Sequence, residues 1–322
     1  MNILWIKDGK KGHEKQVKVL LEELTKTINT SIYEENYHIS SFKRFFDFFY
    51  LGVSYLFHLN KLNNISKKYS QHNIDIVIGA GRNTHARMLL IKRFYGNKVK
   101  AISILTPGIF KDNFDFICAP NHDKEKLKNC NNAIYFEGSL AKVSNSNTDE
   151  KIGLIGLGGV NKHFIFNEND LTKQIEYILS LYSNKHWYIY ASRRTPHSMV
   201  QKINLLTKSF PYLTVADKNF DETLQKASMK FITQDSINMV YESLSSVGQT
   251  FLFSMVEKKQ NKVTKQINNL IQNKQIGYLE NTIMSDGLRK IKIQPQNQYN
   301  DIFAEVEKVS FQLINKLNLK VK

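Results

Sequence analysis

Short runs of apolar residues alternate along the first half of the chain with longer segments in which apolar residues recur every three or four positions. Runs of the first kind predict buried strands, and segments of the second kind predict helices. The predicted strands are Asn2–Ile6, Ile74–Ile78, Lys98–Leu105 and Phe114–Ala119, and helices are expected over residues 17–24 and 86–94. Because strands that alternate with helices form parallel sheets, the pattern predicts an α/β, doubly wound domain.

The same alternation resumes after residues 138–150, which are polar, rich in serine and asparagine, and without periodicity. Such a stretch indicates a domain boundary, so we expect two domains, residues 1–147 and 148–322. The later predicted strands are Ile152–Leu157, Trp187–Ala191, Met229–Ile232 and Thr250–Phe253; the later helices lie within 171–181, 237–247, 258–272 and 299–317. The last helix is expected to pack back on the first domain.

One turn of the second half, residues 233–236, joins a predicted strand to a predicted helix. Ligands of open α/β sheets bind at the carboxyl ends of strands, and the free N–H groups of a helix N-terminus attract phosphate. Asp235 and Ser236 therefore become candidate phosphate-site residues, and Glu242, two turns further, could reach a ribose. The alternative is that Asp235 or Ser236 only caps a core helix.

Two other turns follow strands of the second half. Gly158 and Gly159 allow a ligand to approach the backbone closely, although they lack the spacing of a dinucleotide fingerprint. Arg193 and Arg194 stand at a strand end before Pro196, where two guanidinium groups suit a diphosphate.

The first strand leads into a loop with Asp8, two glycines and His13, but without the spacing of a P-loop. A histidine there is a candidate general base for an acceptor hydroxyl. A capping or structural role is the alternative. Polar side chains also follow the next strands, where Arg82, Asn83, His122 and Asp123 are expected to line one crevice. No third ligand accompanies the His122-Asp123 pair, so no metal site is predicted.

Residues 42–62 are rich in phenylalanine and tyrosine and carry basic residues at their edges. Their uncharged core is too short to span a bilayer. A helix lying in the membrane interface, with Phe45, Phe49 and Phe57 in contact with lipid, is one interpretation. An ordinary buried helix is the other.

The 322 residues carry a net charge of +16 and only two cysteines. The charge favours a polyanionic partner, which includes nucleic acid, an acidic membrane surface or a phosphorylated small molecule. No nucleic-acid-binding module is recognisable, so nucleic acid is not expected. The cysteine count excludes a disulfide framework and fits a reducing cytoplasm, and no signal peptide is expected at the start of the sequence.

Several of these segments together resemble the elongated-mitochondria (ELM) family, named for mitochondrial fission in plants. They are Trp5–Lys10 with Gly12–Gln16, Gly79–Thr84, Pro120–Asp123, Gly158–His163, and Ser192–Pro196 with Thr233–Glu242. Bacterial members look like GT-B glycosyltransferases and are linked to lipopolysaccharide or capsule assembly. Gln234 departs from the pattern, which has a small residue there.

The resemblance implies two facing doubly wound, Rossmann-like domains of the GT-B kind, with a nucleotide-sugar donor on the second and an acceptor on the first. Helix N-termini and arginines can stabilise the departing diphosphate, so no metal or other cofactor is expected. The expected donor contacts are Gly158, Gly159, Lys162, Ser192, Arg193, Arg194, Asp235, Ser236, Met239 and Glu242. His13 and Asp8 are the catalytic candidates on the acceptor side.

The function expected from this resemblance is transfer of a sugar from a nucleotide-sugar to a cell-envelope acceptor such as lipopolysaccharide, capsule or another lipid-linked molecule. A lipid-linked acceptor at the inner face of the membrane would account for the aromatic segment and the positive charge, and places the protein in the cytoplasm, peripheral on the cytoplasmic membrane. Two alternatives are a nucleotide-sugar epimerase on the same fold and a non-enzymatic membrane adaptor.

Overall fold

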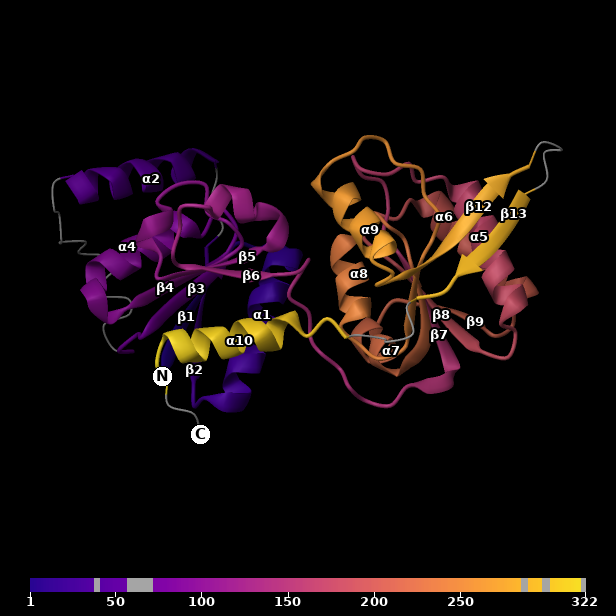
Figure 1. The fold of residues 1–322 in the computed structure, drawn as a ribbon, viewed down its shortest axis with the longest axis horizontal. Helices are drawn as coiled ribbons and strands as arrows, with labels where there is room; N and C mark the ends of the chain where they lie inside the picture. Colours follow the sequence, from indigo (N-terminus) through magenta and orange to yellow (C-terminus); the bar gives the residue numbers. More distant parts are fainter. Residues whose placement is uncertain (38–40, 57–71, 285–288, 297–301, 320–322) are drawn as a thin grey trace. The chain divides into compact units, whose positions relative to one another are not determined.

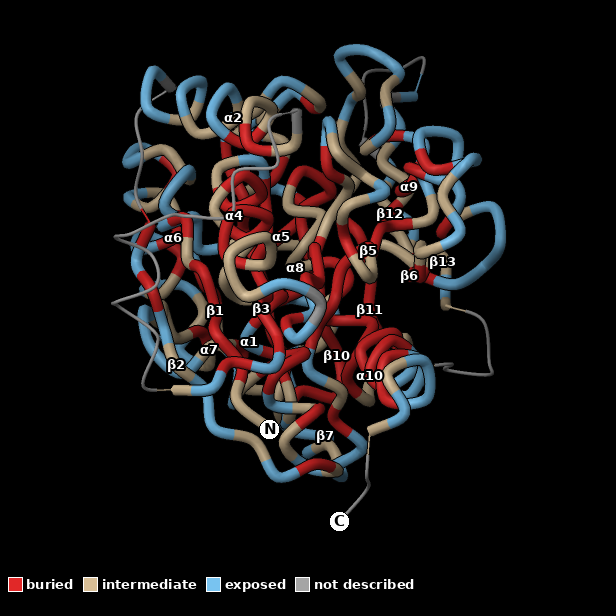
Figure 2. The backbone as a smooth tube through the Cα atoms, turned by 90° about the vertical axis from the view of Figure 1, so that its left-hand side faces the viewer, coloured by how far each residue is buried: buried red, intermediate tan, exposed pale blue. Residues whose placement is uncertain are grey.

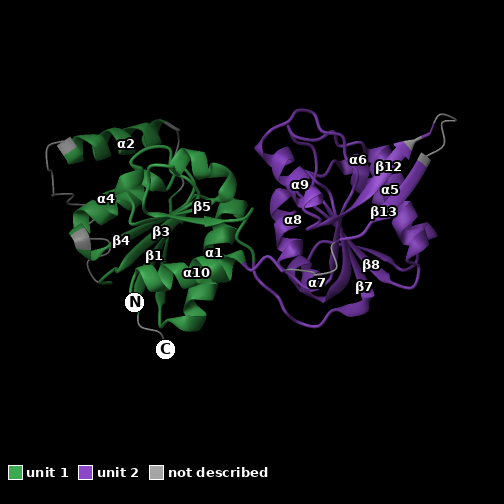
Figure 3. Ribbon diagram, in the orientation of Figure 1, with its two compact units in different colours: residues 1–141, 305–322 green, residues 142–304 purple. Residues whose placement is uncertain are grey.

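The computed structural model describes residues 1–37, 41–56, 72–284, 289–296 and 302–319. The chain divides into two compact units, Met1–Ala141 with Glu305–Lys322, and Lys142–Ala304 (Figure 3). The division lies within the polar stretch 138–150, a few residues before the boundary expected at 147/148. The segment from Glu305, which the sequence included in residues 148–322 as a helix expected to pack back on the first domain, belongs to the first unit.

The described part of the first unit is built on a parallel sheet with the strand order β2-β1-β3-β4-β5-β6 (Figure 1). Its strands are β1 (Asn2–Lys7), β2 (Ser31–Asn36), β3 (Ile76–Ala80), β4 (Lys100–Ile104), β5 (Phe116–Pro120) and β6 (Ala133–Phe136). Its helices are α1 (Lys11–Thr27), α2 (Ser41–Leu56), α4 (His85–Tyr95) and α10 (Glu305–Lys316), with short 3-10 helices η1 (Gly96–Lys98), η2 (Lys111–Asn113) and η3 (Asn121–Leu127).

Both faces of this sheet are covered, which is why its central strands are continuous apolar runs. Every residue of β3 is buried. In β1, Leu4 and Ile6 join a core cluster with Leu51 of α2 and Met88 of α4. Helix α1 packs on β3 and β4 and beside α10, which also contacts β6. The last helix thereby completes the first unit.

The described part of the second unit contains a sheet with the order β13-β12-β11-β10-β7-β8-β9, parallel except for the β12–β13 pair. Its strands are β7 (Asp149–Leu157), β8 (His186–Ala191), β9 (Leu213–Ala216), β10 (Ala227–Ile232), β11 (Gln249–Leu252), β12 (Gly277–Ile283) and β13 (Arg289–Gln294). Its helices are α5 (Glu168–Leu181), α6 (His197–Ser209), α7 (Phe220–Lys226), α8 (Ile237–Leu244) and α9 (Lys262–Gln272).

Two core clusters lie on the two faces of this second sheet. Ile155 and Leu157 of β7 pack with residues of α5 and α6. Leu154, which points to the opposite face, packs with residues of α7, α8 and α9. The buried positions concentrate in the strands in both units (Figure 2). The expected fold class, α/β with two doubly wound units, is confirmed.

The aromatic segment expected over residues 42–62 forms α2, which the structure follows to Leu56. Phe57 lies outside the described residues. Among the helices of the described chain, none is long and apolar enough to cross a membrane.

Candidate functional site

The strand order of the second unit changes direction between β7 and β10. Chain connections leave these two strands toward opposite sides of the sheet, and ligands of open α/β sheets bind at such switch points. The turn after β7 begins at Gly158, and the turn after β10 comprises residues 233–236. The β8 turn with Ser192, Arg193 and Arg194 lies beside β7. Three stretches singled out from the sequence therefore meet at the topological switch point.

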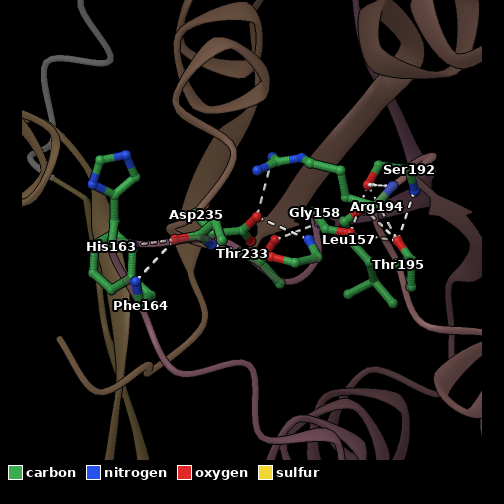
Figure 4. A network of polar contacts seen from close by, with 11 residues as sticks. Leu157, Gly158, His163, Phe164, Ser192, Arg194, Thr195, Thr233 and Asp235 are labelled. Atoms are coloured by element: carbon green, nitrogen blue, oxygen red, sulfur yellow. Dashed lines mark hydrogen bonds and ion pairs between the residues drawn. The ribbon is translucent and has the colours of Figure 1, made fainter. Parts of the chain in front are cut away.

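A network of hydrogen bonds ties these three turns together (Figure 4). The N–H of Gly158 donates to Thr233 Oγ1 at 2.7 Å, and the N–H of Gly159 donates to Asp235 Oδ2 at 2.8 Å. A guanidinium nitrogen of Arg194 lies 3.2 Å from the same carboxylate oxygen. Asp235 thus joins the β10 turn to the other two.

Asp235 is buried, with no side-chain exposure. Burial raises the pKa of its carboxyl group, while the N–H of Gly159, Thr233 and the charge of Arg194 oppose the rise. Its Oδ1 atom has no hydrogen-bond partner within the described chain. These features indicate that Asp235 holds the three turns together, whereas a direct contact with a donor stays a prediction.

The glycine pair is explained by the same packing. A Cβ atom on Gly158 would lie 2.2 Å from the Asp235 carboxylate, and one on Gly159 would lie 2.0 Å from the backbone oxygen of Arg194. Both distances are far shorter than van der Waals contact. The two glycines therefore make room for the neighbouring turns, whereas the close approach of a ligand, for which the sequence suggested them, stays a prediction.

The β8 turn is closed by its own side chains. Ser192 Oγ donates to the carbonyl of Gly158 at 2.6 Å, and Thr195 Oγ1 donates to the same carbonyl. This closure leaves Arg193 exposed at the tip of the turn, with no hydrogen-bond or ion-pair partner in the described residues. Lys162, which follows β7, is also exposed and has no such partner in the described residues. Unpaired cations at a sheet edge offer charge to an anionic ligand.

The N-terminus of α8 enters the same region. Its N-cap residue, Ser236, makes no side-chain capping bond within the described chain. The first-turn N–H groups are therefore not occupied by a side-chain cap, and the positive end of the helix dipole points to the strand ends. The alternative that Ser236 caps the helix through its hydroxyl group is wrong in this structure.

Three other residues of the segment from β10 to α8 were singled out from the sequence. The sulfur of Met239 packs against Gly156 of β7. A Cβ atom on that glycine would lie only 2.4 Å from it. Glu242 is half-buried in the second turn of α8. Gln234 is buried and donates from Nε2 to the Phe253 carbonyl at 2.7 Å, so this large side chain is directed to the end of β11.

The switch point of the first unit lies between β1 and β3, and it carries the second set of candidates. Asp8 follows β1 and has no side-chain exposure; its Oδ2 atom lies 2.9 Å from Nδ1 of His13 in the first turn of α1. Its other oxygen accepts from the Lys10 N–H at 3.1 Å. Burial alone would raise the pKa of Asp8, but the hydrogen bonds from His13 and Lys10 hold it below its usual value.

This pairing fixes the orientation of the imidazole. With Nδ1 donating to the carboxylate, the neutral ring leaves Nε2 as an acceptor, and this atom has no other partner in the described residues. Gly81 of the β3 turn, at φ +85°, lies against the ring: a Cβ atom there would be 2.2 Å from Nδ1. A histidine held by a buried carboxylate is the arrangement of a general base.

The four residues that were expected to line one crevice form two separate pairs. Arg82 and Asn83 follow β3, and Asn83 Oδ1 accepts from Arg44 of α2 at 3.0 Å. His122 and Asp123 begin η3 after β5, where Asp123 accepts from Thr106 at 2.9 Å and pairs with Lys126 at 2.7 Å. Strand β4 lies between the two pairs. In the described chain no group of three His, Cys, Asp or Glu side chains is placed to hold a metal ion.

Several residues of these sites were not found from the sequence. Thr233 and Thr195 are polar turn residues of a common kind, and only the fold brings them to Gly158. Arg44 lies on an aromatic helix and reaches the β3 turn from another part of the chain. Lys230 lies outside these turns, but it also gave a signal, because it interrupts the apolar strand Met229–Ile232 and is fully buried.

Comparisons with known proteins agree with this architecture. The family model for mitochondrial fission ELM1 matches residues 11–310. The uncharacterized protein RP120 of Rickettsia prowazekii is 26% identical, over 79% of this chain and 83% of that protein. UDP-GlcNAc 2-epimerase from Neisseria meningitidis, solved with UDP-GlcNAc, superposes with a TM-score of 0.54 at 11% identity, covering 99% of this chain and 100% of that chain.

A second solved structure, assigned as a UDP-N-acetylglucosamine 2-epimerase of Listeria monocytogenes, has a TM-score of 0.52 at 10% identity. The match covers 83% of this chain and 81% of that chain. At such identities the likeness shows the fold alone, which this chain shares with both structures.

Proposed function

Because this chain belongs to the mitochondrial fission ELM1 family and carries two switch-point sites of different chemistry, we propose that it is a GT-B glycosyltransferase. The second unit binds a nucleotide-sugar donor, and the first unit binds the acceptor. The observation that carries the proposal is the α8 N-terminus, which lacks a side-chain cap in the described chain and enters a sheet edge with unpaired Arg193 and Lys162. That combination suits a diphosphate.

The donor site works by stabilising charge. As the bond between the sugar's anomeric carbon and the diphosphate breaks, negative charge grows on the leaving oxygen. The first-turn N–H groups of α8 and the guanidinium of Arg193 are fixed donors for that charge, so they stabilise the transition state more than the ground state. Asp235 holds the three turns in place, and no metal ion is required by this assignment.

The acceptor side supplies the base. Nε2 of His13 takes the proton of the acceptor hydroxyl as its oxygen forms the new bond to the anomeric carbon, and the diphosphate leaves with the electron pair of the broken bond. Asp8 holds the ring in the tautomer that this step needs and stabilises the imidazolium that results. We assign a lipid-linked molecule of the cell envelope as the acceptor, because α2 of the first unit exposes aromatic rings.

UDP-GlcNAc is the first donor to test, since the Neisseria enzyme of the same fold was solved with it. The full chain is incubated with the donor, with and without a membrane lipid extract, and UDP and sugar products are measured. Transfer predicts that UDP release depends on the lipid extract. Absence of both turnover and binding for a panel of nucleotide-sugars would contradict the proposal.

His13→Ala gives the sharpest variant. We expect turnover to fall about 100-fold or more with donor affinity nearly unchanged, because the base acts on the acceptor. Asp8→Asn should produce a smaller loss of the same kind. If His13 is structural only, the variant should lose stability and keep wild-type turnover per folded molecule.

A nucleotide-sugar epimerase is the second candidate, favoured by the fold shared with 2-epimerases. It differs from a transferase in a measurable way: the sugar changes configuration with no acceptor present. A membrane adaptor would show neither reaction and would not need an organised diphosphate site.

A further inference from the structure

Helix α2 of the first unit exposes an aromatic stripe, which comprises Phe42, Phe45, Phe46 and Phe49. These positions are spaced i, i+3, i+4 and i+7, so they lie on one face of the helix. Phe45 and Phe49 are 65% and 60% exposed. Single exposed apolar residues are ordinary, but a contiguous set of four large rings marks an interaction site.

The exposure does not come from a loosely attached helix. Leu51 and Ser54 on the opposite face are fully buried, and Leu51 belongs to the core cluster of the first unit. The ring of Phe110 stacks between Phe48 and Tyr55, with centroid distances of 6.5 and 5.9 Å. The core therefore holds α2 by one face and directs the aromatic stripe to the outside.

A cavity of about 620 Å³ lies along the base of this stripe. It is lined by Arg44, Phe45, Phe48, Phe49, Arg82, Gly108, Ile109 and Phe110. Its walls are thus apolar apart from two guanidinium groups, and no carboxylate is among these lining residues. Ile109, 49% exposed, extends the apolar surface beyond the rim.

The two arginines are available for an anion in different ways. Arg44 donates to the side-chain oxygen of Asn83 at 3.0 Å, which positions its guanidinium group without neutralising it. Arg82 is exposed and has no ion-pair or hydrogen-bond partner in the described chain. Two like charges at one apolar cavity repel each other, and a bound phosphate would relieve that repulsion by bidentate hydrogen bonds.

We propose that this cavity and the aromatic stripe bind one phosphate-bearing lipid of a membrane surface, with the phosphate between Arg44 and Arg82 and the first methylenes along Phe45, Phe49 and Ile109. Charge complementarity selects this occupant, since the neutral headgroup of a glycolipid would leave both guanidinium groups uncompensated. The volume lies in the range of small-molecule sites, so it accommodates a headgroup and part of an acyl chain.

The position of the cavity also links it to the base. Arg82 follows Gly81, whose Cα lies against the His13 ring. Arg82 therefore belongs to the turn that packs on the His13 ring, and a lipid phosphate held there favours a phosphate-linked lipid as the acceptor. This last step rests on the proposed function, whereas the binding of the lipid does not.

The test is the affinity of the full chain for vesicles of phosphatidylcholine with and without phosphatidylglycerol. Wild type should bind the anionic vesicles. The double variant Arg44→Gln/Arg82→Gln should bind them about 10- to 100-fold more weakly, because charge-assisted hydrogen bonds are lost. Phe45→Ser/Phe49→Ser should lose affinity as well and keep its melting temperature, because both rings are exposed.

Two matched variants control for nonspecific effects. Phe311→Ser removes a ring of α10 that is 66% exposed, and Lys208→Gln removes an exposed charge of α6. Neither should change vesicle binding. Equal affinity for neutral and anionic vesicles, or full binding by the arginine double variant, would overturn the proposal; so would inorganic phosphate that binds as tightly as the lipid.

Titration of the same samples with UDP separates this inference from the donor assignment. Vesicle binding that responds to the variants, without UDP binding, would leave the lipid site standing and remove the donor site. UDP binding, together with vesicle binding that the variants do not change, would leave the donor site standing and remove the lipid site.

Discussion

At the scale of single residues, the donor-side turns show how close packing constrains side-chain identity. Gly159 faces backbone atoms of Arg194, which cannot rotate away as a flexible side chain would. Asp235 is held by donors from two other turns. Each residue therefore determines the shape of the turns, and the sequence alone could suggest only that glycines and a carboxylate lie near a strand end.

Gly159→Ala should consequently destabilise the protein by at least about 1–3 kcal/mol, the usual cost of forcing extra volume into a packed site. Gly108→Ala is the matched control. A Cβ atom at Gly108 would have no heavy atom within 4 Å, so the free energy of unfolding of this variant should change by less than about 0.5 kcal/mol. Denaturant unfolding of both variants tests the pair, and equal stability would contradict the packing explanation.

At the scale of elements, α8 carries complementary groups at its two ends. Its N-terminus lacks a side-chain cap in the described chain, whereas carbonyls of its last turn and of the turn that follows surround the buried Nζ of Lys230. Four acceptors lie 2.7–3.0 Å from that nitrogen and share its three N–H groups: the carbonyls of Ser243, Ser246 and Val247, and Ser246 Oγ. Such a cation satisfies the last carbonyls and complements the helix dipole.

Burial lowers the pKa of Lys230 to about 7, from 10.5. Between these two values the unfolded chain retains a proton that the folded chain has released, so the free energy of unfolding rises with pH. This lysine contributes up to about 1.4 kcal/mol per pH unit to that rise. Below pH 7 both states are protonated, the cost of burying the charge is fully present, and the slope from this group disappears.

Lys230→Met removes the titrating group. We expect the free energy of unfolding of this variant to rise less steeply between pH 7 and 9 than that of the wild type, although the freed carbonyls lower its overall stability. Lys208→Met, on the exposed surface of α6, controls for the loss of one positive charge. Parallel wild-type and Lys230→Met profiles across this range would show that Lys230 does not titrate there.

Elements were predicted from the sequence where burial on both faces leaves a continuous apolar run, as in β3 and β7. The antiparallel pair β12–β13 was missed, although Arg289–Gln294 alternates polar and apolar residues; the partner, Gly277–Ile283, has too few apolar residues to be recognised. The edge strand β2 gave a similarly weak signal. Whether such segments form strands depends on the strands and helices that they pack against, and the local sequence does not reveal these partners.

Part of the candidate site could also be predicted from the sequence. Strand ends locate the polar turns, so Asp8, His13 and Arg193 could be selected from the sequence. The sequence places Asp8 and His13 in one loop, but the hydrogen bond between them depends on how that loop folds. The links from Thr233 to Gly158 and from Arg44 to Asn83 join distant segments, and no sequence pattern announces them.

At the scale of the whole molecule, the two units divide the chemistry. Each unit places its polar residues at the point where its strand order reverses, but the first carries a carboxylate–imidazole pair and the second carries cations and a helix N-terminus. The first unit also carries the aromatic stripe of α2. This division is the basis for assigning a lipid-linked acceptor to one unit and a nucleotide-sugar to the other.

Calorimetric titration of the full chain with UDP, ADP and GDP tests the central claim, that the carboxyl edge of the second sheet binds a nucleoside diphosphate. We predict saturable binding of at least one of them. Arg193→Ala should weaken that binding about 10- to 100-fold, and Lys208→Ala should not change it. No saturable binding of any of the three, or wild-type affinity in both Arg193→Ala and Lys162→Ala, would contradict the account.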